Sequence, residues 1–272
     1  MAVGHWTLDD ISWQRFDPEK VDPELLKLVK AAGMVEYNGG VYADYLCNVF
    51  PDDAEFQQAA KIWAREEVQH GEALGRWATM ADPSFDFDAC FERFRAGYQI
   101  PVDAAASVRG SRSGELVARC IVEVGTSSFY ASMASMSDEP VLKEICRKIA
   151  ADELRHYKLF YTHLNRYLER EKIGRWRRIG VALGRIGESE DDELAYAFFA
   201  ANDDGTPYDR KRHGQAYLNR VYACYQPDHV QRAVSMIFKA AGLNPQSRLS
   251  SLVSRLAFAM LRLRSRRAAA AA

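Results

Sequence analysis

Two short stretches combine acidic residues with a histidine at a spacing that suits metal binding. They are Glu66-Glu67-Val68-Gln69-His70 and Asp152-Glu153-Leu154-Arg155-His156. Positions i and i+3 lie on one face of an α-helix, so the second acidic residue and the histidine of each stretch can bind one ion together. We therefore expect each Glu-x-x-His to supply two metal ligands from one helix.

A lone glutamate stands in an apolar run before each stretch. Glu36 precedes Glu67 by 31 residues (67 minus 36), and Glu123 precedes Glu153 by 30 residues (153 minus 123). Four glutamates and two histidines in this order are the ligand set of a carboxylate-bridged metal pair inside a four-helix bundle. Because both halves repeat the order, the sequence predicts an internal duplication with a two-fold axis through the metal pair.

Start and stop signals predict the helices that must carry these ligands. Asp22-Pro23-Glu24 begins a helix that we expect to run to about Val49, before Pro51. Further helices are expected over about 52–80, 113–136 and 140–172, with a short one at about 87–97. The six ligands fall in apolar stripes of these helices, where an ionised carboxylate is costly unless it is paired or bound to metal. Ordinary buried Glu–His pairs are the alternative, but two copies in the same register argue against them.

The predicted fold class is all-α, with a four-helix bundle, an internal two-fold repeat and a helical C-terminal extension. Residues 1–21 form an N-terminal arm whose Trp6, Trp13 and Phe16 should pack on the bundle. The bundle covers 22–172 and the extension covers 173–272. Within the extension, the acidic run 188–193 is expected to start a short helix through Phe199, and helices are expected over about 209–225 and 228–241.

Composition narrows the class of protein. The net charge of −1 argues against general nucleic-acid binding. Five cysteines without a C-x-x-C pair argue against a disulfide framework and favour a reducing cytoplasm. The first residues do not resemble a signal peptide, and no stretch of about eighteen apolar residues could span a bilayer.

The charge and the type of the donor atoms favour iron, with manganese as the alternative metal. Four carboxylates carry −4, which two divalent ions would neutralise, and this mixture of oxygen and imidazole donors is less typical of zinc. We expect Glu67 and Glu153 to bridge both ions, and Glu36 and Glu123 to bind at the two ends. His70 and His156 would each bind one ion through one ring nitrogen.

The second ring nitrogen of each histidine needs a hydrogen-bond partner. Asp152 and Glu66 immediately precede the bridging glutamates. By the two-fold symmetry we pair Asp152 with His70 and Glu66 with His156. The alternative is that both are ordinary surface acids.

Small residues flank the lone glutamates on both helices. Gly39 and Ala43 follow Glu36, and Ser127 follows Glu123, with Tyr130 further along the same stripe. These residues either line a channel for a long apolar substrate or allow two helices to pack closely. The sequence leaves both interpretations open.

The segment 247–267 is basic and amphipathic. Arg248, Arg255 and Arg262 are seven residues apart, and leucines line another face. The segment is either a helix packed on the bundle with a solvated basic face, or a surface for lipid headgroups or an acidic carrier protein.

The complete pattern resembles the ferritin-like di-iron carboxylate superfamily. Within it, Glu66-Glu67-Val68-Gln69-His70-Gly71 and Ala150-Ala151-Asp152-Glu153-Leu154-Arg155-His156 are similar to the E-E-x-x-H-G and A-A-D-E-x-R-H motifs of the soluble acyl-carrier-protein desaturases. Thr126 stands where those enzymes carry a threonine, one turn after the third glutamate. The resemblance covers residues 22–170; the remaining sequence looks unlike the plant desaturases.

The resemblance implies a ferritin-like bundle holding two iron ions that activate O2 with two outside electrons from a donor such as a ferredoxin. The expected reaction is desaturation or hydroxylation of an apolar substrate, foremost an acyl chain, free or on a carrier protein. Thr126 would handle protons at the metal site, or would only bond back to a helix carbonyl. A homodimer is among the expected assemblies.

Two other functions fit the six ligands. One is a ferroxidase or peroxide-scavenging protein of the bacterioferritin or rubrerythrin type. The extra hundred residues and the lack of a C-x-x-C rubredoxin module argue against it. The other is a metal-dependent binding module without turnover.

Overall fold

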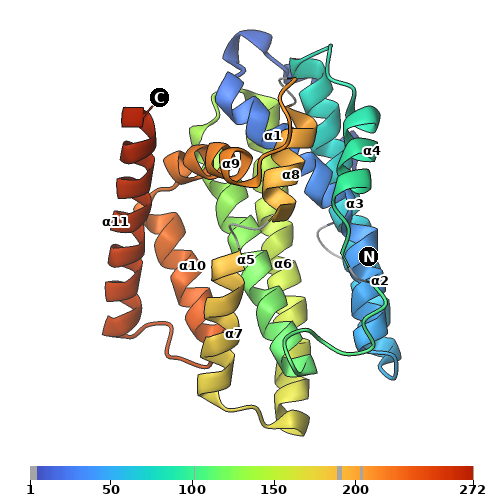
Figure 1. Ribbon diagram of the computed structural model, residues 1–272, viewed down its shortest axis with the longest axis vertical. Helices are drawn as coiled ribbons and strands as arrows, with labels where there is room; N and C mark the ends of the chain where they lie inside the picture. The colour runs from blue at the N-terminus through green and yellow to red at the C-terminus, as the bar shows by residue number, and fades with distance from the viewer. Residues whose placement is uncertain (1–4, 101, 189–191, 203–204, 272) are drawn as a thin grey trace.

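Every secondary-structure element is a helix within the residues that the computed structural model describes, which are 5–100, 102–188, 192–202 and 205–271 (Figure 1). This confirms the all-α class. None of the helices in these ranges is long and apolar enough to cross a membrane. The elements are η1 (Leu8–Asp10), η2 (Trp13–Arg15), η3 (Pro18–Lys20), α1 (Pro23–Tyr37), α2 (Gly39–Val49), α3 (Ala54–Ala81), α4 (Phe87–Gly97), α5 (Arg112–Met136), α6 (Pro140–Glu171), α7 (Arg175–Gly187), α8 (Asp192–Ala201), α9 (Arg210–Cys224), α10 (Pro227–Ala240) and α11 (Arg248–Ala271).

Two helical hairpins form the centre of the molecule. α1 and α2 pack against α3, α5 packs against α6, and α3 joins the hairpins by packing against α6. Figure 1 shows α5 and α6 running side by side through the middle, with α1, α2 and α3 beside them. The four expected bundle segments are therefore present, in the expected order.

Side-chain caps set where the bundle helices begin. The Asp22 carboxylate accepts hydrogen bonds from the backbone N–H groups of Glu24 and Leu25, and Asp53 caps α3 through the N–H of Phe56. The Glu139 side chain caps α6 in the same way, ahead of a proline at the first helical position. These caps satisfy backbone donors that a helix start leaves unpaired, which is why the expected start points agree with the structure.

The first bundle segment is not the single helix expected over 22–49. It breaks at Asn38: α1 ends at Tyr37, one residue after Glu36, and α2 begins at Gly39. A Cβ atom at Gly39 would lie 2.5 Å from the Cβ of Glu67 on α3. The backbone of α2 therefore approaches α3 more closely than a continuous helix with ordinary side chains would allow.

Apolar clusters above and below the ligands enclose them in a polar layer. On α3, Phe56 and Trp63 belong to one cluster, Leu74 and Trp77 belong to the other, and Glu67 and His70 lie between. α6 repeats this arrangement, with Ile149 before its ligands and Phe160 after them. The bundle thus holds its ligands rigidly by packing on both sides.

The extension shares the core of the bundle. Phe198 of α8 and Tyr217 of α9 belong to the same cluster as Trp77, and Ala182 of α7 and Ala240 of α10 belong to the other. The expected helices 209–225 and 228–241 correspond to α9 and α10. The basic segment 175–186, for which no helix was expected, forms α7. In the acidic run 188–193, residues 189–191 lie outside the described residues, and α8 begins at Asp192.

The N-terminal arm packs against α3 and α6, with residues 1–4 outside the described part. Trp6 is only 8% exposed, and Trp13 and Phe16 pack against the same cluster. The Phe16 ring meets Trp77 edge-on, and the backbone N–H of Asp17 donates to Glu139. The arm is therefore ordered by contacts with α3 and α6.

Candidate metal centre

Four helices each bring part of the ligand set to one buried point. Glu36 comes from α1, Glu67 and His70 from α3, Glu123 from α5, and Glu153 and His156 from α6. All six side chains are buried, with no residue more than 8% exposed. Because Glu and His are three residues apart on α3 and on α6, they leave each helix on the same face. The structure thus brings together every predicted metal ligand.

The six side chains form two overlapping groups of four. One group is Glu36, Glu67, His70 and Glu153, and the other is Glu67, Glu123, Glu153 and His156; within each group one donor atom per residue lies within 4.8 Å of all the others. Glu67 and Glu153 belong to both groups. This is the arrangement that two bridging carboxylates between neighbouring ions require.

Each of the six residues has a buried donor atom without a hydrogen bond. These atoms are Glu36 Oε2, Glu67 Oε1, His70 Nδ1, Glu123 Oε1, Glu153 Oε1 and His156 Nδ1. The histidine nitrogens among them lie close to the carboxylate oxygens: His156 Nδ1 is 2.9 Å from Glu67 Oε1, and His70 Nδ1 is 3.3 Å from Glu153 Oε1. Buried polar atoms without a hydrogen bond are costly, and native proteins rarely keep them unless they have another role. Six of them facing one another fit metal ions, because each atom has a lone pair to donate.

The two histidines are oriented by acids from the opposite hairpin. His70 Nε2 lies 3.1 Å from Asp152 Oδ2, and His156 Nε2 lies 2.7 Å from Glu66 Oε2. This is the cross-pairing expected from the two-fold symmetry. When Nε2 donates its proton to the carboxylate, Nδ1 keeps a free lone pair directed at the centre.

Burial and crowding of like charges perturb the acids of the centre. Burial raises the pKa of Glu67 well above its usual value, and the neighbouring carboxylates of Glu153 and Glu36 raise it further. Burial also raises the pKa of Glu123 to about 8. Four ionised carboxylates this close together need positive charge among them, which protons or cations can supply.

The pKa values of the two histidines shift in the direction opposite to the one that burial alone would produce. Burial by itself would lower the pKa of His70, but the surrounding carboxylates of Asp152 and Glu153 outweigh it and raise the pKa well above the usual value. The same balance raises the pKa of His156, with Glu123 foremost among its carboxylate neighbours. Without metal the centre therefore holds protons, which divalent ions would have to displace.

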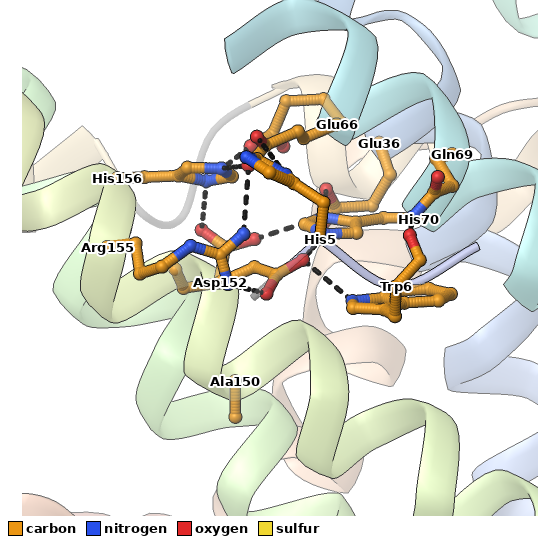
Figure 2. Close-up of polar contacts among 12 residues, drawn as sticks. His5, Trp6, Glu36, Glu66, Gln69, His70, Ala150, Asp152, Arg155 and His156 are labelled. Carbon is orange, nitrogen blue, oxygen red and sulfur yellow. Dashed lines mark hydrogen bonds and ion pairs between the residues drawn. The ribbon is translucent and has the colours of Figure 1, made fainter. Parts of the chain in front are cut away.

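Asp152 and Glu66 are held by hydrogen bonds and ion pairs from residues that the sequence did not assign to the centre (Figure 2). Arg155 bonds to Asp152 and lies 3.2 Å from Glu66, so it joins the two acids. The Trp6 indole N–H donates to Asp152 over 2.8 Å, and His5 Nδ1 lies 2.8 Å from Glu66. The only signal for Arg155 was its place inside the second motif.

Trp6 also covers one ligand ring. Its indole stacks on His70 with 6.0 Å between ring centroids and 9° between planes, and its backbone carbonyl accepts a hydrogen bond from Gln69. The arm therefore closes the side of the centre at which Asp152 lies. Figure 2 shows His5 and Trp6 extending along this side.

Thr126 and Tyr130 both contact ligands. The Thr126 hydroxyl lies 2.7 Å from Glu153 Oε2 and also within 3.2 Å of the carbonyls of Val122 and Glu123. The geometry therefore includes both the back-bond to the helix and a contact with a ligand. Tyr130, expected in a channel, is buried and donates to Glu36 Oε1 over 2.5 Å.

The other predicted channel residues are engaged in packing. A Cβ on Gly39 would overlap α3, as described above, and the Ser127 hydroxyl donates to the carbonyl of Ala150 on α6 over 2.9 Å. Ala43 is buried in the cluster below the centre. At Gly39 the close-packing alternative explains the small residue.

A surface cavity of about 350 Å³, open to solvent, lies elsewhere, between α5, α6 and α10. It is lined by Ala131, Ala134, Ser135, Arg147, Ala150, Ala151, Leu154, His229 and Arg232. Its α6 wall therefore includes residues on both sides of Asp152 and Glu153. Small apolar side chains form the wall, and two arginines and a histidine supply positive or polar groups.

Comparison with known proteins does not place the chain in a family. No protein-family model matches the sequence. No curated protein matches it either. The argument for function therefore rests on the site itself.

Proposed function

We propose that this protein holds two metal ions, iron being the favoured metal and manganese the alternative, in a ferritin-like four-helix bundle. In the proposal it uses O2 and two external electrons to oxidise an apolar substrate, foremost an acyl chain. The observation that carries the proposal is the pair of four-ligand groups that share Glu67 and Glu153. The six buried donor atoms that have no hydrogen bond support it, since metal ions would satisfy all of them.

The ferritin-like repeat is supported by the symmetry of the contacts. The α1–α3 hairpin and the α5–α6 hairpin each contribute one lone glutamate and one Glu-x-x-His. Each hairpin also supplies the acid that holds the histidine of the other, Asp152 for His70 and Glu66 for His156. A two-fold axis between the hairpins accounts for all of these features at once.

A bound pair of iron ions would supply electron transfer and O2 chemistry that amino-acid side chains lack. The protein's own residues would position the metal ligands and deliver protons to them. Tyr130 holds one oxygen of Glu36, which leaves the other free for an ion. In the proposal Thr126, which is half-buried, carries a proton to Glu153, and its support is the 2.7 Å contact between them.

The cavity beside α6 supports oxidation of a substrate. Alanines and Leu154 form the apolar part of its lining, and the Ala150 and Ala151 turn leads directly into Asp152 and Glu153. An acyl chain would enter here, where Arg147 and Arg232 suit a carboxylate or phosphate head. The electrons would come from a separate donor such as a ferredoxin.

A ferroxidase or peroxide-scavenging activity is the second candidate. The tight packing at Gly39 favours this activity, because the packing closes the channel that was predicted to admit a substrate on the α2 side. A protein that only oxidises iron or reduces peroxide needs no room for an organic substrate near its metals.

Metal analysis and single-turnover oxidation test the proposal. The protein loaded anaerobically with Fe(II) should bind about two ions per chain and should consume O2. Products should form from acyl substrates, offered free or on a carrier. Iron well below two per chain would contradict the metal site, and O2 consumption without product from any acyl substrate would favour the ferroxidase.

Two variants at one exposed position test the cavity. Ala151→Phe should fill the cavity and abolish substrate oxidation while iron loading stays near the wild-type level. Ala151→Ser, the matched control, should behave as the wild type does. If both variants retain full product formation, the substrate binds elsewhere.

A further inference from the structure

α11 has an apolar face toward the protein and a second apolar face toward solvent. On the inner side Val253, Phe258 and Leu261 pack against α10 residues such as Val234 and Phe238. On the outer side five large apolar side chains are more than half exposed: Leu249 (55%), Leu252 (52%), Leu256 (61%), Met260 (52%) and Leu263 (51%). Packing on the bundle thus explains only one of the two faces.

The five exposed side chains form one continuous stripe. Their spacing of three, four, four and three residues keeps them on a single side of the helix. From Leu249 to Leu263 the stripe extends about 21 Å, at about 1.5 Å per residue. Figure 1 shows α11 at the edge of the molecule, with α10 between it and α5, so the stripe lies on an outer surface.

The charge beside the stripe is entirely positive. Residues 248–271 contain no aspartate or glutamate. Arg248, Arg255, Arg262 and Arg266 are exposed, and among the described residues none of them forms an ion pair. Three of them are seven residues apart and therefore lie along one border of the stripe.

We propose that α11 binds the surface of an anionic lipid bilayer. The leucine stripe would enter the boundary between headgroups and acyl chains, and the bordering arginines would contact the lipid phosphates. Because no helix in the described residues can cross a bilayer, the helix would lie along the surface. The inference is independent of the metal centre.

The charge pattern disfavours a second copy as the occupant. Pairing two α11 stripes would bring only arginines together along their borders, with no acid to offset them. An anionic lipid surface supplies the missing negative charge and also accepts apolar side chains.

Co-sedimentation with vesicles tests the proposal. The full-length protein should bind vesicles of phosphatidylcholine mixed with phosphatidylglycerol, and should bind pure phosphatidylcholine at least tenfold more weakly. Binding to the anionic vesicles should weaken as salt rises, because the arginine contacts are screened. Circular dichroism and thermal melting of each variant confirm that the fold is retained.

Two sets of substitutions separate the contribution of the leucine stripe to vesicle binding from that of the arginines. Leu252→Ser, Leu256→Ser and Leu263→Ser together should abolish binding to both kinds of vesicle. Arg248→Gln, Arg255→Gln and Arg262→Gln together should weaken binding to anionic vesicles by about fivefold for each charge removed. The matched control is Lys61→Gln, Arg65→Gln and Lys158→Gln, three exposed cations on α3 and α6, which should change binding little.

Three results would overturn the proposal. The first is equal binding to neutral and anionic vesicles, or to neither. The second is binding that the leucine substitutions leave unchanged. The third is a wild-type dimer, measured by light scattering, that the leucine substitutions dissociate while vesicle binding is absent, since a second copy would then be the occupant.

Discussion

At the scale of single residues, the two bridging candidates differ from the other ligands. Glu67 and Glu153 are common to both four-ligand groups, whereas Glu36 and Glu123 each belong to one. Loss of a shared ligand removes a donor from two sites, but loss of an unshared ligand weakens one. The ligands are therefore distinguishable by metal stoichiometry.

We expect Glu153→Ala to bind well below one iron per chain, and Glu123→Ala to keep about one. Removing Glu153 leaves each group with three donors, whereas removing Glu123 leaves the Glu36 group complete. Elemental analysis gives the stoichiometry, and circular dichroism checks that helix content is retained. Iron near two per chain in Glu153→Ala would rule out a bridging role.

The sequence predicted the cluster of six candidate ligands and the acids that hydrogen-bond to its histidines, but not the residues that hold those acids. Asp152 and Glu66 could be assigned because they adjoin motif residues and the motifs are symmetric. Trp6 reaches Asp152 across 146 positions, and His5 reaches Glu66 across 61 (66 minus 5). Such long-range contacts leave no periodic pattern in the sequence, so only the fold reveals them.

At the scale of elements, the break between α1 and α2 shows how a glycine serves the centre. Caps such as Asp22 and Asp53 are local signals, so the helix starts were predictable. The break at Asn38 depends on the approach of α2 to α3 at Gly39, which is a contact between distant segments. The spacing of three residues from Glu36 predicted that Gly39 faces inward, but it did not show how closely α2 approaches α3 there.

Gly39→Ala and Gly40→Ala should therefore have opposite effects. The new Cβ at Gly39 would displace Glu67, so we expect a loss of about 1–3 kcal/mol in the free energy of unfolding and weaker iron binding. A Cβ at Gly40 meets nothing within 4 Å, so alanine should be neutral or should stabilise α2 by up to about 1 kcal/mol. Denaturant unfolding of the two metal-free variants and their iron titrations measure both effects. Equal stability of the two variants would contradict close packing at Gly39.

At the scale of the whole molecule, the metal centre and the stability of the fold are linked. The polar layer lies between two apolar clusters that include residues of the extension, so perturbing it should affect the entire chain. The sequence predicted the helices 209–225 and 228–241 but not that they complete the core of the bundle. Their amphipathic patterns show that each has an apolar face, without specifying the surface that covers it.

Metal removal should lower the melting temperature, and more so at higher pH. In the metal-free protein the raised pKa values of Glu67, Glu123, His70 and His156 mean that the folded state binds more protons than the unfolded state near neutrality. Stability that depends on bound protons is lost as pH rises, here from about 5 toward 8. Bound divalent ions replace the protons and stabilise the folded state.

Calorimetry of the chelator-treated and iron-loaded protein between pH 5 and 8 measures this effect. The gap between the two melting temperatures should widen as pH rises, and re-addition of Fe(II) without O2 should close it. A gap that stays constant or narrows with rising pH would show that the centre does not exchange protons for metal.

The arm that covers the centre also imposes an order on folding. The arm precedes α6 along the chain, yet its anchors Asp152 and Glu139 belong to or cap α6, more than a hundred residues later. It can dock only after both hairpins have assembled, because contacts of such high sequence separation form late. Until then the Asp152 side of the cluster is open to solvent. The arm therefore closes after the later segments on which it docks, and under the proposed function this leaves an interval in which metal can enter before Trp6 covers His70.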